Sequence, residues 1–423
     1  MYKKRLIENL LKEYQEDFPA ILIEGAKAVG KTSTCLTVSN TDFRLDDSDV
    51  LEFLKASMES IIKRKPPVLI DEWQRLPEVW DYIRRIVDSN LASGSILLTG
   101  SSPNLYSNIH SGSGRIVRLK MRPFSIEERE MSQIKVRLSD FLLGEQPLLA
   151  SEETNIDFDC YLEEIFKSGF PGIRNLSERA IERALLSYTE NIVTHDIKEN
   201  NIIIRKPQAL SLWLKTYAAA SATTTAFSTI TQTAMSQDSK APNEKTSSNY
   251  REILSAMGII EELPSWLPLG KLFPALGKTP KHFIVDPSFI PSLLNFDKQI
   301  ITDGKAKSPI GKINKSIIRQ LFETLIFQSL ATYSEVNEAT LSHLRLSNGS
   351  REIDFIVQKK NTLVAIEAKT SSSITDSDVR HLNWFEEVAK KEYSVSKIVL
   401  YMGKHAYIRK DGVFVIPAAM FGA

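Results

Sequence analysis

A glycine-rich segment near the amino end has the residue types needed to hold phosphate. It reads GAKAVGKT and fits the pattern G-x-x-x-x-G-K-[ST] at every fixed position. Glycines let the backbone turn its N–H groups toward phosphate oxygens without a Cβ in the way. The Lys31 ammonium would face the β- and γ-phosphates, and the Thr32 hydroxyl would ligate Mg²⁺. The predicted ATP-binding residues are Gly25, Ala26, Ala28, Val29, Gly30, Lys31, Thr32 and Ser33.

An acidic pair follows the next apolar run. Asp71 and Glu72 end the stretch VLIDE, and the carboxyl ends of parallel strands are where the crevice of an open α/β sheet lies. We expect Asp71 to hold Mg²⁺ and Glu72 to polarise the attacking water; an exposed loop pair is the alternative. Thr99 ends a further run, ILLTG, and is placed to sense a γ-phosphate, as is Ser101, with helix capping or a turn as the alternative for both.

An arginine follows the Ser/Gly-rich stretch SGSG. Arg115 would reach a γ-phosphate, in cis or from a neighbouring subunit, and stabilise the charge of the transition state. Arg118 and Arg122 are alternatives, and surface arginines flanking a strand are the plainer interpretation. Action in trans would require a homo-oligomer, which the sequence leaves open.

A second set of charged residues lies near the carboxyl end, in the strand-like runs REIDFIVQ and TLVAIEAKTS. Side chains alternate along a strand, so Asp354, Glu367 and Lys369 would share one edge of adjacent antiparallel strands. Two carboxylates can hold Mg²⁺ while a lysine activates water for phosphodiester attack. Glu323, in the amphipathic run IIRQLFETLIF, would complete the shell. The predicted metal ligands are Glu323, Asp354 and Glu367, with Lys369 catalytic; a solvated strand face is the alternative.

The elements around these residues favour an α/β protein. AILIEG is typical of a buried parallel strand, and a helix can follow the glycine-rich loop. Farther along, residues 161–204 are mostly helical, and the polar stretch SATTTAFSTITQTAMSQ indicates short pieces and loops. A helix over Tyr250–Met257, a stop at Gly258 and a short strand give the outline of a winged helix, which reads DNA or serves as a packing module.

Length and composition bound these interpretations. The chain of 423 residues predicts two or three domains. A formal charge of +1 argues against coating nucleic acid by bulk charge, although a local basic patch remains compatible. Cys35 and Cys160 lie far apart, which fits a reducing cytoplasm. No apolar run approaches the roughly 18 residues of a membrane span, so we expect no membrane partner.

Several of these stretches together resemble a known family. GAKAVGKTS, VLIDEWQRLP, ILLTGSSP, GSGRIVRLKMRPFSIEE, SGFPGI, KHFIVDPSF and REIDFIV…VAIEAKTS look like bacterial and archaeal AAA-type P-loop ATPases with a C-terminal domain of unknown function. The resemblance covers most of the chain. Arg115 matches the family's Gly-Arg position, which favours it over Arg118. KHFIVD lacks the usual acidic pair of the PD-(D/E)XK motif.

The resemblance implies three domains. These are a P-loop ATPase with an AAA-like parallel sheet over 1–145, a helical and winged-helix region over 158–302, and an α/β restriction-endonuclease-like domain over 315–423. The implied function is ATP binding and hydrolysis with Mg²⁺, coupled to a nuclease-like domain that binds or cleaves DNA. The alternative is a nucleotide-regulated signalling or assembly ATPase whose inactive C-terminal domain binds a partner.

Overall fold

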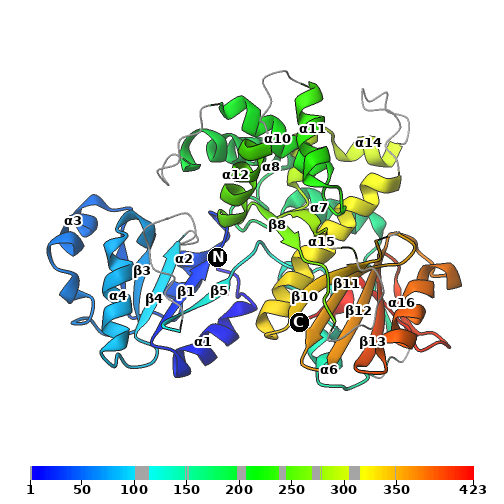
Figure 1. The fold of residues 1–423 in the computed structure, drawn as a ribbon, viewed down its shortest axis with the longest axis horizontal. Helices are drawn as coiled ribbons and strands as arrows, with labels where there is room; N and C mark the ends of the chain where they lie inside the picture. Colours follow the sequence, from blue (N-terminus) through cyan, green and yellow to red (C-terminus); the bar gives the residue numbers. More distant parts are fainter. Residues whose placement is uncertain are drawn as a thin grey trace. The chain divides into compact units, whose positions relative to one another are not determined.

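The structure, a computed structural model, describes residues 2–100, 114–147, 149, 152–197, 206–237, 244–268, 277, 279–303, 315–347 and 349–423. Contacts divide the chain into two compact units, which we describe separately (Figure 1). The first unit comprises Met1–Arg122, Ile197–Ile203 and Arg251–Ile259, and the second comprises Pro123–Asp196, Ile204–Tyr250 and Ile260–Ala423. The helical region and the C-terminal sheet, expected as separate domains, thus fall mainly within one unit.

The first unit is built on a parallel five-stranded sheet in the order β2-β3-β4-β1-β5. Its central strands are apolar on both faces, as a parallel sheet covered on both sides requires. Val79, Trp80 and Ile83 recur at helical spacing on α4 and pack in the same core as the strands. The elements are α1 (Ile7–Asp17), β1 (Ala20–Glu24), α2 (Lys31–Leu36), β2 (Thr41–Arg44), α3 (Ser48–Ala56), β3 (Val68–Asp71), α4 (Glu78–Asp88), β4 (Ile96–Gly100) and β5 (Ile116–Lys120).

The second unit contains a mixed seven-stranded sheet in the order β10-β11-β12-β13-β15-β14-β7. β10, β11 and β12 are antiparallel neighbours, whereas β12, β13 and β15 run parallel. Helix α16 lies against this sheet (Figure 1), and its Val379, Leu382 and Phe385 join the sheet's core. The sheet and its helix are β7 (Glu152–Glu153), β10 (Thr340–Arg345), β11 (Glu352–Lys359), β12 (Thr362–Lys369), α16 (Asp376–Ala389), β13 (Ser394–Tyr401), β14 (His405–Ile408) and β15 (Phe414–Pro417).

The remaining elements of the second unit are mostly helical. The expectation of short pieces and loops after residue 221 was wrong in part, because α11 is a regular helix that buries Ile230 and Ala234 one turn apart. These elements are α5 (Ile126–Arg129), β6 (Val136–Arg137), α6 (Leu138–Leu142), α7 (Phe158–Lys167), α8 (Glu178–Asn191), α10 (Pro207–Ala219), α11 (Phe227–Gln237), β8 (Ile260–Leu263), β9 (Lys281–Ile284), α13 (Phe289–Leu294), α14 (Lys298–Asp303), α15 (Lys315–Val336) and β16 (Phe421–Gly422).

In one helix, α12 (Glu244–Ala256), the residues up to Tyr250 are assigned to the second unit and those from Arg251 to the first. It begins six residues before the helix that the sequence predicts, and Gly258 follows its end with a φ of 70°. The strands β8 and β9 then pair antiparallel. Within the described ranges, none of the helices is both long enough and apolar enough to span a bilayer.

Candidate functional site

The glycine-rich loop connects β1 to α2 in the first unit. Gly30 precedes α2 with a φ of 103°, and Ala28 also has a positive φ, of 65°. Gly25 has a φ of 152°, and a Cβ there would lie 2.1 Å from the carbonyl oxygen of Met121. Only glycine fits this approach, because the colliding atom belongs to the backbone. The loop therefore has the strand–loop–helix geometry that a phosphate-binding loop needs.

Lys31 is folded back onto the loop. Its Nζ donates to the carbonyl oxygens of Gly25 at 2.9 Å and Ala26 at 3.0 Å. Burial lowers the pKa of the Lys31 ammonium, while the carboxylates of Glu72 and Asp71 act in the opposite direction. The ammonium is thus held by neutral oxygens, and phosphate oxygens can replace them.

Asp71 joins the tips of two strands to the start of α2. The hydroxyl of Thr32 donates to Asp71 Oδ1 at 2.8 Å, and the hydroxyl of Thr99 donates to the same oxygen. Asp71 is buried at the end of β3. A hydroxyl beside a carboxylate offers the hard oxygen ligands that Mg²⁺ prefers, so these residues fit the metal that a nucleotide brings.

Glu72 stands next to this group in a left-handed backbone conformation, with a φ of 56°. Such a conformation is uncommon for a residue with a side chain and marks a constrained position. Its carboxylate accepts a hydrogen bond from the amide of Gln74. The sequence analysis missed Gln74, although its place two residues after the acidic pair was visible in DEWQ.

Arg115 precedes β5 at the end of the sheet opposite the phosphate loop. Its Nε is 2.6 Å from Asp88 Oδ1, and both side chains are substantially exposed. The arginine therefore pairs with the end of α4, and the structure does not bring it to the residues of the loop. Ser101 and the start of the SGSG stretch lie outside the described residues.

Two contacts of the phosphate loop escaped the sequence analysis. The buried Arg5 donates to the carbonyl oxygens of Val29 at 2.7 Å and Arg122 at 2.6 Å. Gly258 approaches the loop so closely that a Cβ there would lie 2.8 Å from the backbone nitrogen of Ala26. Both residues belong to the first unit. No local sequence pattern predicts the contacts of Arg5 and Gly258, because these contacts join segments far apart in the chain.

In the second unit, the predicted carboxylates do come together. Phe355 of β11 pairs with Ile366 of β12, which places Asp354 and Glu367 on neighbouring strands. Glu323 lies in the middle of α15, buried like the other two. Lys369 Nζ is 2.7 Å from Glu367 Oε2. We call Glu323, Glu352, Asp354 and Glu367 the carboxylate cluster.

The cluster also contains a lysine that was not predicted. Lys281, the first residue of β9, places its Nζ 2.6 Å from Glu323 Oε1 and 3.1 Å from Asp354 Oδ1. Burial would lower the pKa of Lys281, but Glu323 and Asp354 raise it, so the ammonium stays charged. A lysine opening an otherwise apolar strand, in KHFIV, was the available signal.

The electrostatics of the cluster follow from burial and from this lysine. Burial and the neighbouring Asp354 raise the pKa of Glu323 to about 7 and that of Glu367 to about 8. Burial would raise the pKa of Asp354 too, but Lys281 and Lys369 hold it below its usual range. Asp354 is therefore more firmly ionised than Glu323 and Glu367.

This arrangement does not fit the expected metal ion. Among the residues that the structure describes, no group of three or more His, Cys, Asp or Glu could hold one. An ammonium already takes the oxygens of Glu323 and Asp354 that Mg²⁺ would need. The expectation of ligands Glu323, Asp354 and Glu367 was correct about proximity but did not include the cation among them.

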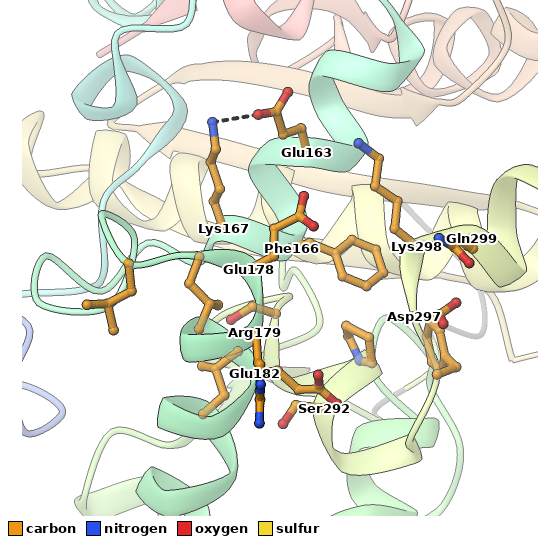
Figure 2. A pocket seen from close by; sticks show the side chains of 16 residues that line it. Glu163, Phe166, Lys167, Glu178, Arg179, Glu182, Ser292, Asp297, Lys298 and Gln299 are labelled. Atoms are coloured by element: carbon orange, nitrogen blue, oxygen red, sulfur yellow. Dashed lines mark ion pairs between the residues drawn. The ribbon is translucent and has the colours of Figure 1, made fainter.

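A cavity of about 580 Å³ lies elsewhere in the second unit, between α7, α8, α13 and α14 (Figure 2). Its wall mixes apolar side chains such as Phe166 and Leu185 with acidic and basic ones, and Lys167 pairs with Glu163 at 2.7 Å. Both signs of charge line the cavity, so its overall charge does not indicate a ligand class. This cavity was not predicted from the sequence.

Three segments of the chain match known protein families. Residues 17–130 match the family described as AAA domain, residues 159–300 match a domain of unknown function (DUF8612), and residues 319–421 match a domain of unknown function (DUF4143). The AAA match covers the segment with the phosphate loop and the parallel sheet, and it agrees with the P-loop ATPase class that the resemblance implied. The matches to the rest of the chain name no nuclease or winged-helix family.

Among solved structures, the chain is similar to the Walker-type ATPase PABY2304 of Pyrococcus abyssi. The two are 16% identical, with a TM-score of 0.39. The similarity covers 69% of this chain and 96% of that one. No curated protein matches the sequence. The class rests on the AAA match and on the loop geometry.

Proposed function

We propose that this protein binds ATP with Mg²⁺ and hydrolyses it. The observation that carries the proposal is the convergence of Thr32 and Thr99 on Asp71 Oδ1, beside a loop that contains Lys31. A P-loop lysine, a magnesium-holding hydroxyl and an acidic strand end are the parts that phosphoryl transfer requires. The AAA match over 17–130 supports the same class of activity.

The residues divide the work by their chemistry. Backbone N–H groups of Gly25, Ala26, Ala28, Val29, Gly30 and Ser33 would cradle the phosphates. Thr32 and Asp71 would hold Mg²⁺, which neutralises charge on the phosphate oxygens when it is bound. Glu72 would orient the attacking water after its carboxylate leaves the Gln74 amide. Thr99 would contact the γ-phosphate side of the site.

The test is steady-state ATP hydrolysis with binding measured in parallel. Lys31→Ala should lose both ATP affinity and turnover, because the loop lysine binds the phosphates. Glu72→Gln should retain binding and lose turnover by about 10²–10⁴-fold, the usual range for a general base. Lys27→Ala, an exposed lysine of the same loop, is the matched control. Full turnover in Glu72→Gln would remove Glu72 from the mechanism.

We also propose that the second unit contacts DNA, with partner-protein binding as the alternative. The order α10, α11 and α12 followed by the antiparallel pair β8–β9 supports a winged-helix arrangement. The exposed face of α11 carries Ser228, Thr229 and Gln232, which can hydrogen-bond phosphate and base edges. Within this proposal, residues 158–302 and 315–423 work as separate functional modules.

DNA binding is tested by fluorescence anisotropy with duplex DNA at several salt concentrations. Specific contact predicts an affinity that falls with salt and drops further in Gln232→Ala, whereas the exposed Lys390→Ala should bind as the wild type does. Salt-dependent binding that is unchanged in Gln232→Ala would move the contact away from α11. ATP turnover that does not respond to DNA would favour the signalling or assembly alternative.

Two further proposals concern the cellular location of the protein and the role of Arg115 in an oligomer. The free thiols Cys35 and Cys160 support a reducing cytoplasmic location. Arg115 is proposed as the residue that stabilises the transition state, in trans within a homo-oligomer, because it precedes β5 at the end of the sheet opposite the loop of its own chain. Mixing Arg115→Ala with Lys31→Ala subunits should restore turnover if the arginine acts across subunits.

A further inference from the structure

Lys281 holds the position of a cation within the carboxylate cluster. Its Nζ lies 2.6 Å from Glu323, 3.1 Å from Asp354 and 3.3 Å from Glu352. The carboxylates come from α15 and β11, whereas the lysine comes from β9. One ammonium therefore joins oxygens from two separate elements, which is the task that a bound metal ion performs in a carboxylate site.

The ammonium of Lys281 is buried among these partners. Lys281 is 1% exposed, and so is Asp354, while Glu323 is 2% exposed. An ammonium has three N–H donors, and three carboxylate groups surround this one. The ring of Phe355 lies 5.7 Å from Nζ and covers it on another side. A buried charge must be compensated, and these carboxylates provide the compensation for Lys281.

The rest of the cluster is engaged as well. Asp354 Oδ2 accepts the backbone N–H of Ala368 at 3.1 Å. Glu367 pairs with Lys369 at 2.7 Å. The guanidinium of Arg319 lies 3.6 Å from both Glu323 and Asp354. Four carboxylates thus meet three cations from this chain, and a divalent ion among them would lie beside the Lys281 ammonium, whose charge repels it.

We propose that Lys281 is a built-in cation that takes the place of a divalent metal, so that the carboxylate cluster binds no Mg²⁺ while β9 is in position. The cluster then connects α15, β11 and β9 through buried ion pairs. The domain that contains the sheet does not hydrolyse phosphodiesters. This proposal goes beyond ATP hydrolysis and does not depend on it.

The experiment measures Mn²⁺ binding, by electron paramagnetic resonance and calorimetry, on the full chain without nucleotide. All proteins carry Asp71→Asn so that the phosphate loop contributes no site. Lys281→Ala should gain one Mn²⁺ site at least about tenfold tighter than any site of the parent. Adding Glu323→Gln and Asp354→Asn should abolish the new site, and Lys390→Ala, an exposed lysine, should gain none.

Folding is followed by circular dichroism in the same samples. Mn²⁺ should raise the melting temperature of Lys281→Ala and leave that of the parent unchanged, because a ligand stabilises only the state that binds it. A folded Lys281→Ala protein that binds no Mn²⁺ would overturn the proposal.

If Lys281→Ala does not fold, the parent decides the question. The proposal then requires that the parent does not bind Mn²⁺ through Glu323. A Mn²⁺ site in the parent that is lost in Glu323→Gln would overturn it. Plasmid nicking by the wild type in Mg²⁺ that Lys369→Ala abolishes would overturn it too. Loss of ATP hydrolysis has no bearing on these outcomes, so the two proposals fail separately.

Discussion

Two regions of this molecule place a buried lysine near carboxylates, and they do so differently. Lys31 donates to neutral backbone carbonyls of its own loop, and burial lowers its pKa. Lys281 donates to carboxylates, which raise its pKa despite burial. A lysine held by neutral groups can be transferred to phosphate at little cost. A lysine held by buried charges is fixed, because its departure would leave those charges uncompensated.

The largest expected effect tests this difference directly. Lys281→Met should reduce the free energy of unfolding by about 3–5 kcal/mol, the cost of leaving one side of a buried ion pair alone. Lys31→Met should change it by less than about 1 kcal/mol, since only neutral hydrogen-bond partners are lost. Urea unfolding at neutral pH without metal measures both.

The exposed Lys390→Met is the control for a lost lysine charge and should change stability by about 0.5 kcal/mol at most. Equal losses in Lys281→Met and Lys31→Met would show that burial alone, and not the charge of the partners, sets the cost. That result would end the comparison between the two lysines.

A buried histidine in the second unit shows a case in which burial outweighs a nearby carboxylate, because Asp354 raises the pKa of His343 less than burial and Lys281 lower it. Burial lowers the pKa of His343 to about 4, and its Nε2 lies 3.1 Å from the carbonyl oxygen of Thr279. The unfolded chain binds this proton near pH 6.5 and the folded chain does not, so folding loses up to about 3 kcal/mol as pH falls from 6.5 to 4.

His343→Gln should remove that loss, as seen in urea unfolding at several pH values. The raised carboxyl pKa values of Glu323 and Glu367 act in both proteins and therefore cancel in the difference. The exposed His405→Gln should follow the wild type throughout. Parallel pH profiles for wild type and His343→Gln would mean that the imidazole takes up its proton while folded.

The sequence predicted the geometry of the phosphate loop and its neighbouring strand ends far better than the geometry of the carboxylate cluster. Gly25 to Thr32 form one continuous motif, and Asp71 and Thr99 end neighbouring parallel strands, so local pattern and sheet topology suffice. The contact of Lys281 with Glu323 and Asp354 spans 42 and 73 residues of sequence. No local pattern encodes such a pairing, since an opening lysine on a strand is ordinarily solvated.

The sequence did not predict helix α11 for a related reason. Its polar composition indicated short pieces and loops, and the burial of Ile230 and Ala234 stabilises an 11-residue helix there that propensity alone does not favour. The hydrogen bond from Gln74 to Glu72 is local in sequence, but it depends on the left-handed backbone at Glu72, which the residue type does not predict.

Backbone crowding at the phosphate loop gives a smaller effect. Gly25→Ala should cost about 1–3 kcal/mol, the range for forcing extra atoms into a packed site, because its Cβ would meet the carbonyl of Met121. Gly172→Ala, where a Cβ would meet nothing within 4 Å, is the matched control. Thermal unfolding measures both, and an unchanged Gly25→Ala protein would show that the loop relaxes freely.

The smallest effect is expected at the surface pair of Arg115 and Asp88. Their side chains are 38% and 47% exposed, so a double-mutant cycle of Arg115→Ala and Asp88→Ala should give a coupling below about 1 kcal/mol. A weak pair leaves the arginine available to a phosphate, as Lys31 is and Lys281 is not. A coupling above about 2 kcal/mol would make Arg115 a fixed structural residue like Lys281, and its proposed part in catalysis would lose its physical basis.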